Sequence, residues 1–134
     1  MHPSAWPACY TLLTSVLMLG TGFLVAKGRA RYGIAAPATT GNPDFERLFR
    51  VQMNTMEQSL IFLPVLWVDH LYGTPSVLAV AGAIWLVGRV LYAVGYMQAA
   101  PKRSAGFGIA ALGFVVLLVD AAIGLARSLV SAGA

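Results

Sequence analysis

Long apolar stretches separated by short polar segments dominate the chain. The first runs from about Pro7 to Ala26, and Met1 to Ala26 contains no Lys, Arg, Asp or Glu. Three more follow at about 45–70, 76–100 and 104–126. Each has roughly 20 to 25 residues, enough for a helix that crosses a hydrocarbon core of about 30 Å. The pattern predicts an all-α membrane protein, a four-transmembrane-helix bundle forming a single domain over residues 1–134.

Helix-breaking residues mark the limits of these segments. The first loop is expected to be rich in them, at Gly28, Gly33, Pro37, Gly41 and Pro43. We expect Asp44 to cap the second helix, whose first half is polar and whose second half is apolar. Pro64 lies inside this helix, which should either kink or be accommodated by its neighbours. A tight turn is predicted at 72–75, and Pro101 should close the third span.

Composition supports a membrane protein and argues against other classes. Hydrophobic residues make up 58% of the chain and charged residues 10%, whereas soluble domains have about 25% charged residues. The basic residues lie between or inside the apolar stretches rather than in one solvated patch, which argues against a nucleic-acid partner. They follow the first apolar stretch instead of preceding it, which favours a retained span over a cleaved signal peptide. The single cysteine, Cys9, excludes an internal disulfide and supports no metal cluster.

The distribution of basic residues predicts the orientation. The first and third connections carry Lys27, Arg29 and Arg31, and Lys102 and Arg103, respectively. The middle turn has no Lys or Arg. By the positive-inside rule, the first and third connections face the cytoplasm and both termini lie outside.

Two polar stripes enter the predicted spans from the cytoplasmic side. One stripe on the second helix covers an arc of about 80° and consists of Glu46, Arg50, Asn54 and Glu57. The other, on the third helix, covers about 60° and consists of Trp85, Arg89, Tyr92 and Tyr96. Ionisable residues inside a membrane are costly, so each requires a partner or a function.

Two explanations of the stripes stay open at this point. In the first, the stripes satisfy each other, with Glu57 pairing with Arg89 and Glu46 with Arg50, and only hold the bundle together. The second starts from the surplus of basic over acidic residues on this side, which anionic lipid headgroups or a small polyanionic ligand would neutralise. Arg103 at the start of the fourth helix would favour a nearby anion and would activate a thiolate there, unless it is only a membrane anchor.

Residues 39–57 contain the pattern Glu-Arg-x-x-Arg-x-x-x-Asn-x-x-Glu, as Glu46, Arg47, Arg50, Asn54 and Glu57. This segment resembles the signature of the MAPEG family, the membrane-associated proteins in eicosanoid and glutathione metabolism. Residues 88–96 are similar to the third-helix segment of the leukotriene C4 synthases and microsomal glutathione transferases of that family.

The resemblance implies a homotrimer that binds glutathione between subunits at the cytoplasmic side, with no metal. One subunit would bind glutathione through Arg50, Asn54, Glu57, Arg89, Tyr92 and Tyr96. The next subunit would supply Arg29 and Arg103, with Gln52 nearby, and Arg103 would be the catalytic residue that activates the thiol.

The implied activity is that of a membrane-bound glutathione transferase, a glutathione-dependent peroxidase, or both, acting on lipophilic electrophiles or lipid hydroperoxides in detoxification. Gln58 and Ala30 depart from the leukotriene-synthase pattern, and the short chain resembles a bacterial member, expected in the inner membrane. A non-catalytic lipid-binding member of the family and a small four-span exporter stay as alternatives. Asp120, inside the fourth span, has no evident partner except Arg127.

Overall fold

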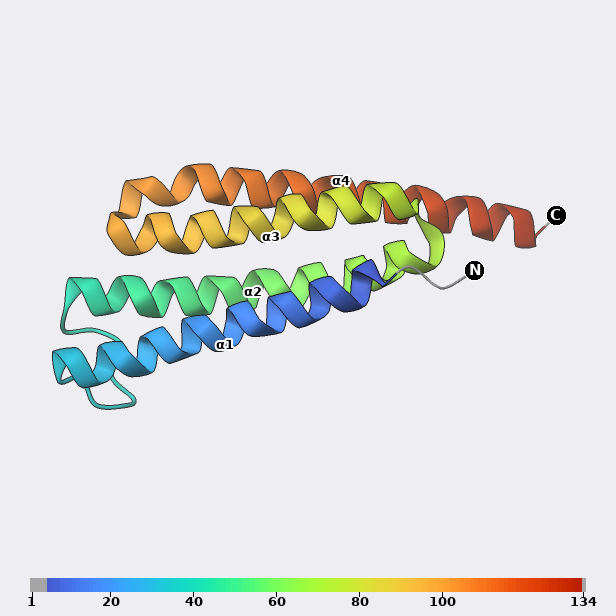
Figure 1. The fold of residues 1–134 in the computed structure, drawn as a ribbon. Helices are drawn as coiled ribbons and strands as arrows, with labels where there is room; N and C mark the ends of the chain where they lie inside the picture. Colours follow the sequence, from blue (N-terminus) through green and yellow to red (C-terminus); the bar gives the residue numbers. More distant parts are fainter. Residues whose placement is uncertain (1–4, 134) are drawn as a thin grey trace.

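Four long helices form an elongated bundle. The computed structural model describes residues 5–133, and both chain ends lie at the same end of the bundle (Figure 1). In chain order the helices are α1 (Trp6–Tyr32), α2 (Pro43–Tyr72), α3 (Pro75–Gln98) and α4 (Arg103–Ala132), with a 3-10 helix η1 (Ala100–Lys102) before α4. The most extensive contact is between α3 and α4, and α2 packs against each of the other three helices. The prediction of a four-helix membrane bundle is confirmed.

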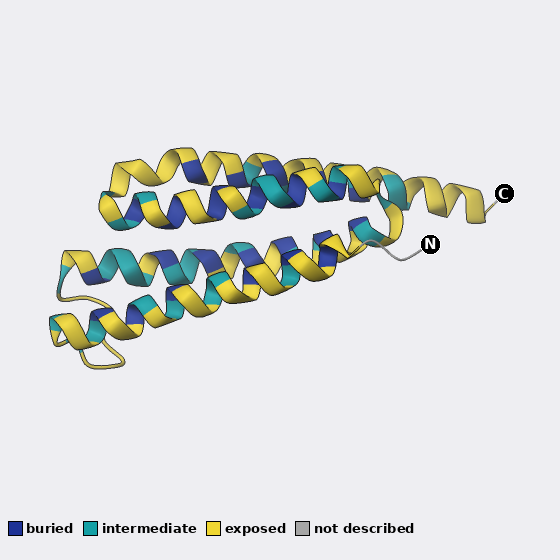
Figure 2. Ribbon diagram, viewed as in Figure 1, coloured by how far each residue is buried: buried dark blue, intermediate teal, exposed yellow. Residues whose placement is uncertain are grey.

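The outer surface of the bundle is apolar. Large side chains such as Leu19 and Phe23 of α1 are 75% and 69% exposed, and exposed positions follow the outside of every helix (Figure 2). Within residues 5–133, three helical segments are long and apolar enough to cross a membrane: Trp6–Tyr32, Pro75–Gln98 and Ala100–Ala132. The polar first half of α2 accounts for its lower hydropathy. An apolar exterior of this extent suits a hydrocarbon surrounding rather than water.

The buried interior combines stacked aromatic rings with small residues. Phe62 of α2 stacks on Trp85 of α3, with ring centroids 3.7 Å apart and an interplanar angle of 1°. A Cβ atom added to Gly113 of α4 would lie 2.6 Å from the backbone nitrogen of Trp85. The absent side chain therefore lets α3 and α4 approach closely, as small residues do in membrane bundles.

The structure corrects the predicted start of the first loop. α1 continues through Gly28 to Tyr32 and ends at Gly33, which has a φ of 66°. Gly28 lies inside α1 on the face that packs against α2. A Cβ there would lie 2.8 Å from the Leu48 side chain and 3.2 Å from the Phe45 ring, so only glycine fits. It serves close packing between α1 and α2 and does not break the helix.

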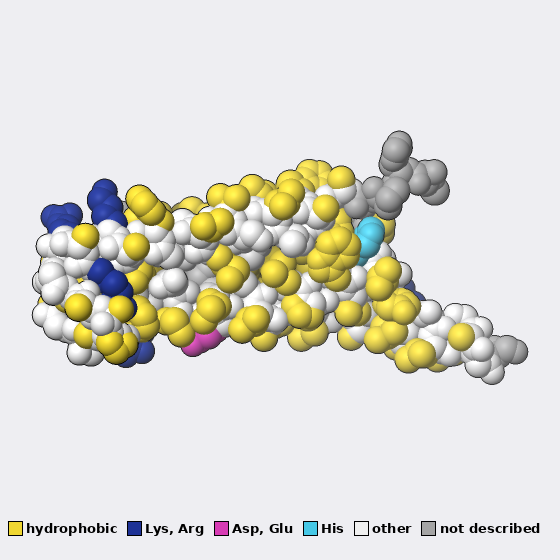
Figure 3. Space-filling view, turned by 90° about the horizontal axis from the view of Figure 1, so that it is seen from below, with side chains coloured by type: hydrophobic (Ala, Val, Ile, Leu, Met, Phe, Trp, Pro, Cys, Tyr) yellow, Lys and Arg dark blue, Asp and Glu magenta, His cyan; other side chains and the backbone are white. Residues whose placement is uncertain are grey.

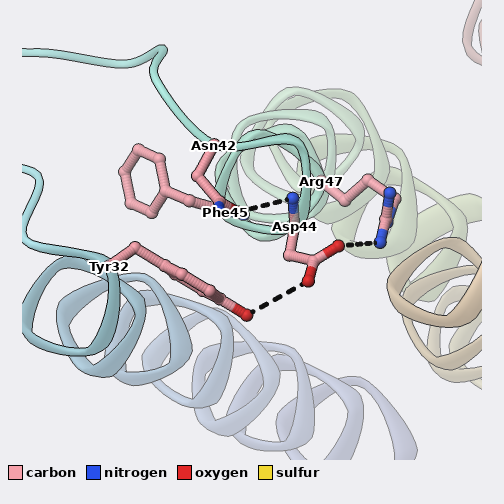
Figure 4. Close-up of polar contacts among 5 residues, drawn as sticks. All are labelled: Tyr32, Asn42, Asp44, Phe45 and Arg47. Carbon is pink, nitrogen blue, oxygen red and sulfur yellow. Dashed lines mark hydrogen bonds and ion pairs between the residues drawn. The ribbon is translucent and has the colours of Figure 1, made fainter.

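The predicted helix cap was also wrong, and some observed helix limits differ from the predicted spans. Asn42, and not Asp44, caps α2, because its Oδ1 accepts hydrogen bonds from the backbone nitrogens of Asp44 (2.9 Å) and Phe45 (3.2 Å) (Figure 4). α2 passes through Pro64 without interruption. α3 ends at Gln98, within two residues of the predicted limit, and α4 continues to Ala132, past the predicted limit near 126, since no Gly or Pro lies between residue 126 and Gly133.

Asp120 has a partner that the sequence analysis did not find. Its carboxylate accepts hydrogen bonds from the backbone nitrogen of Thr74 (2.6 Å) and from the Thr74 hydroxyl (3.2 Å). Thr74 is the N-cap residue of α3, and its own side chain caps none of the first backbone N–H groups of that helix. Asp120 of α4 therefore holds the turn between α2 and α3, instead of pairing with Arg127.

Candidate functional site

A fully buried arginine forms the centre of the candidate site. Arg89 of α3 has an exposed fraction of 0%. Its guanidinium donates hydrogen bonds to Asn54 Oδ1 (3.1 Å) and Thr55 Oγ1 (2.9 Å), both on α2, and lies 4.3 Å from the centre of the Tyr92 ring. A buried charge needs such partners, because desolvation without them is costly. Its Nε has no hydrogen-bond partner within the described part of the chain.

Asn54 connects this arginine to a carboxylate. Because the Asn54 carbonyl accepts from Arg89, its amide points the other way and donates to Glu57 Oε2 at 3.5 Å. Glu57 is exposed, so its carboxylate has lone pairs available for another cation. The alternative in which Glu57 pairs directly with Arg89 is therefore wrong, since the amide of Asn54 lies between them. Glu46 likewise accepts from the backbone nitrogen of Gly41 instead of pairing with Arg50.

An aromatic row joins Arg89 to Arg103. The rings of Tyr92 and Tyr96 lie one turn apart on α3, with centroids 5.7 Å apart. The Arg103 guanidinium carbon lies 4.9 Å from the centre of the Tyr96 ring. Arg103 is the first residue of α4 and is exposed. Cations over aromatic faces are held in place without being neutralised, so Arg103 keeps its full charge for a ligand.

Some of these residues line a cavity of about 360 Å³ between α2, α3 and α4. Its lining consists of Asn54, Tyr92, Arg103, Ser104, Phe107 and Gly108. Three of these are predicted site residues. The other three lie in the first two turns of α4, where spacing from Arg103 is the only signal in the sequence that points to them.

Arg103 and the cavity residues of α2 and α3 belong to the same chain. The resemblance had assigned Arg103 to a neighbouring subunit. Within this chain, the three-residue helix η1 returns α4 directly along α3, which brings Arg103 onto Tyr96. In this chain alone Arg103 therefore lines one cavity with Asn54 and Tyr92, and its assignment to a neighbouring subunit stays a prediction.

Six predicted site residues do not line the cavity. Glu57, Arg89 and Tyr96 contact residues of its lining, whereas Arg29, Gln52 and Arg50 lie apart from it. Arg29 of α1 donates hydrogen bonds to the carbonyls of Ala38 (2.8 Å) and Ile34 (3.4 Å) and so holds the first loop. Gln52 faces α1, since its Nε2 lies 3.3 Å from the position of a Cβ atom built on Gly22. Arg50 is exposed on α2.

The chain is similar in sequence to one known family and to several known proteins. The model of the MAPEG family matches residues 7–123. The chain is 49% identical over 120 residues to the uncharacterized protein sll1147 of Synechocystis sp., covering 90% of this chain and 88% of that protein. It is 41% identical over 105 residues to human microsomal glutathione S-transferase 2, covering 78% and 71% of the two chains. It is 34% identical over 120 residues to bovine leukotriene C4 synthase, covering 85% and 80%.

Proposed function

The chain belongs to the MAPEG family, and from that premise we propose that it is a membrane-bound glutathione transferase that also reduces hydroperoxides. Its relatives include a glutathione S-transferase and a leukotriene C4 synthase, which supports glutathione as a substrate. The second substrate is a lipophilic electrophile or a lipid hydroperoxide that arrives from the bilayer. The observation that carries the proposal is the cavity that Arg103 shares with Asn54 and Tyr92.

The charges around the cavity suit the groups of glutathione. The tripeptide has two carboxylates, one ammonium group and one thiol. The carboxylates require cations, and guanidinium groups match carboxylates well. The exposed Arg50 provides one cation, and the buried Arg89 acts through Asn54, to which it donates a hydrogen bond. The ammonium group requires an anion, and the exposed carboxylate of Glu57 is held beside Asn54 by a hydrogen bond. A volume of about 360 Å³ is within the usual range of small-molecule sites.

Arg103 is proposed to activate the thiol. A thiolate beside a guanidinium at a helix N-terminus is stabilised, so the thiol loses its proton to water near neutral pH. In conjugation, the thiolate sulfur forms a bond to the electrophilic carbon, and the leaving group departs with the bonding electrons. In peroxide reduction, the sulfur attacks the terminal oxygen, which gives a sulfenic acid and an alcohol. A second glutathione then forms the disulfide and releases water.

The predicted site residues that lie away from the cavity suggest a role for an oligomer. We propose a homotrimer in which Arg29 and Gln52, which lie towards α1 and away from the cavity, contribute to the site of a neighbouring subunit. Arg50 lies one turn before Asn54 on the same face of α2 and would reach the ligand from the rim. The positive-inside rule supports a site that opens to the cytoplasm from the bacterial inner membrane, with both termini outside.

The ultraviolet difference spectrum of glutathione bound to the detergent-solubilised protein tests the proposal. We expect a thiolate band near neutral pH that disappears in Arg103→Ala and persists in the control Lys102→Ala, because the Lys102 side chain bonds Gln98 outside the cavity. Saturable binding with no thiolate band would favour a non-catalytic member of the family. If glutathione did not bind, the polar stripes would serve only to hold the bundle together.

A further inference from the structure

A second cavity, of about 280 Å³, lies between α1 and α2 near the end of the bundle that the positive-inside rule predicts to face the cytoplasm. Its lining includes Lys27 and Arg31 of α1, Asp44, Arg47 and Leu48 of α2, and Met97 of α3. It shares no lining residue with the cavity of Asn54 and Arg103. Lys and Arg side chains gather mainly at this end of the molecule, next to an apolar surface (Figure 3).

The charges in this second cavity do not balance. Asp44 forms an ion pair with Arg47 and also accepts a hydrogen bond from the Tyr32 hydroxyl at 3.3 Å (Figure 4). Its negative charge is therefore already compensated by Arg47. Lys27 and Arg31 lie one helical turn apart on α1, and neither has an ion-pair or hydrogen-bond partner for its side chain within residues 5–133. Two positive charges face this cavity without a counter-ion.

An apolar stripe leads directly to these two cations. It lies on the same face of α1, within about 60° of the line through Lys27 and Arg31. Leu13 is 42% exposed, and no heavy atom lies within 4 Å of a Cβ built on Gly20, so this face is open. In chain order the stripe consists of Leu13, Leu17, Gly20 and Leu24, the last of which lines the cavity.

We propose that this cavity binds the phosphate of an anionic membrane lipid, with an acyl chain along the stripe. A headgroup phosphate supplies the negative counter-charge that Lys27 and Arg31 lack. Guanidinium and ammonium groups are common phosphate ligands. The change from apolar to cationic side chains along one helix face matches the change from acyl chain to headgroup in a lipid. A water-soluble anion would use the cations alone, whereas a lipid would also contact the apolar stripe beside them. The site is separate from the proposed glutathione site and does not depend on it.

Lipid retention by the full-length protein in detergent tests this inference. Phosphatidylglycerol, phosphatidylcholine or inorganic phosphate is added, and bound lipid is counted by native mass spectrometry. We expect the double variant Lys27→Gln/Arg31→Gln to bind phosphatidylglycerol about tenfold more weakly or worse. The control Lys102→Gln/Arg127→Gln removes the same charge elsewhere and should bind like the wild type. Gly20→Phe should also weaken retention, because its ring would occupy the stripe without changing any charge.

Several results would overturn the lipid site. Equal phosphatidylglycerol binding by the wild type and both double variants would show that the cavity holds no lipid. Displacement of the lipid by millimolar inorganic phosphate would identify a free anion as the occupant. Cross-linking of Lys27 to a second copy of the chain would identify this face as a subunit contact. A loss of glutathione binding in Lys27→Gln/Arg31→Gln would assign the cavity to the glutathione site, whereas unchanged glutathione binding with lost lipid supports the inference.

Discussion

Arg89 of α3 donates a hydrogen bond to Asn54 of α2 over 3.1 Å, and Asn54 in turn donates to the exposed carboxylate of Glu57. This bond connects a charge in the interior of the bundle to a charge at the rim of the cavity. It also fixes the orientation of the amide, because a guanidinium can only donate. One side chain therefore both satisfies the buried arginine and positions the acceptor proposed for the ammonium group of glutathione.

We expect Asn54→Ala to lower both stability and glutathione affinity. The substitution leaves Thr55 as the one hydrogen-bond partner of the Arg89 side chain among the described residues. An unsatisfied buried donor costs about 1–3 kcal/mol, and a charged donor costs more. The thermal unfolding midpoint and the dissociation constant for glutathione, both in detergent, measure the two effects. Gln58→Ala, a neighbouring polar truncation on α2, should change neither. A variant with full stability and full affinity would show that the Arg89–Asn54 bond has no role.

The roles of Arg103 and Glu57 should separate kinetically. We expect Arg103→Ala to lower kcat by at least about 100-fold, as is usual when a transition-state charge partner is lost, with a smaller change in glutathione affinity. Glu57→Gln should weaken glutathione affinity by about tenfold and leave kcat nearly unchanged, because the ammonium group takes no part in the reaction. Arg103→Lys should recover part of the activity, since it keeps the charge but not the planar guanidinium. Steady-state kinetics with an aryl halide measures all three, and equal effects of both residues on both parameters would contradict the division of roles.

The helices and the polar stripes could be predicted because hydropathy and residue spacing along the sequence indicate them. Four apolar stretches gave four helices, and positions spaced by three or four residues gave the shared face of Arg89, Tyr92 and Tyr96. Contacts between helices were not accessible in this way. Gly28 looks like a helix breaker in the sequence, yet it lies inside α1. The residue is glycine because Phe45 and Leu48 of α2 occupy the space that a side chain would need. Ser104 and Phe107 enter the cavity only because the short helix η1 turns α4 back along α3.

The close approach of α3 and α4 gives a stability prediction. At Gly113 a Cβ would lie 2.6 Å from the backbone nitrogen of Trp85, where neither helix is able to shift cheaply. We therefore expect Gly113→Ala to lower the free energy of unfolding by about 1–3 kcal/mol, as overpacking does. Gly20→Ala on α1 is the control, because its surroundings are open, and it should instead stabilise the helix by about 0.5–1 kcal/mol. Thermal unfolding in detergent compares the two, and similar midpoints would contradict the packing argument.

Asp69 and Asp120 approach each other at the opposite end of the bundle from the cavities. A Cβ built on Gly73 would lie 2.6 Å from Asp69 Cγ and 2.8 Å from Asp120 Oδ2, so the two carboxyl groups converge on one point. Asp69 is 1% exposed, and neither of its side-chain oxygens has a hydrogen-bond partner within residues 5–133. Asp120, in contrast, accepts two hydrogen bonds from Thr74.

This asymmetry predicts opposite effects of two substitutions. Asp69→Asn removes a buried acid that repels its neighbour and supplies an amide donor for Asp120, so we expect the unfolding midpoint in detergent to rise. Asp120→Ala removes the acceptor for both hydrogen bonds from Thr74 and should lower the free energy of unfolding by about 1–3 kcal/mol. Glutathione binding, measured at the far end of the bundle, should be unchanged in both variants. If Asp69→Asn instead destabilised the protein as much as Asp120→Ala, the charge on Asp69 would have a favourable partner that its burial conceals.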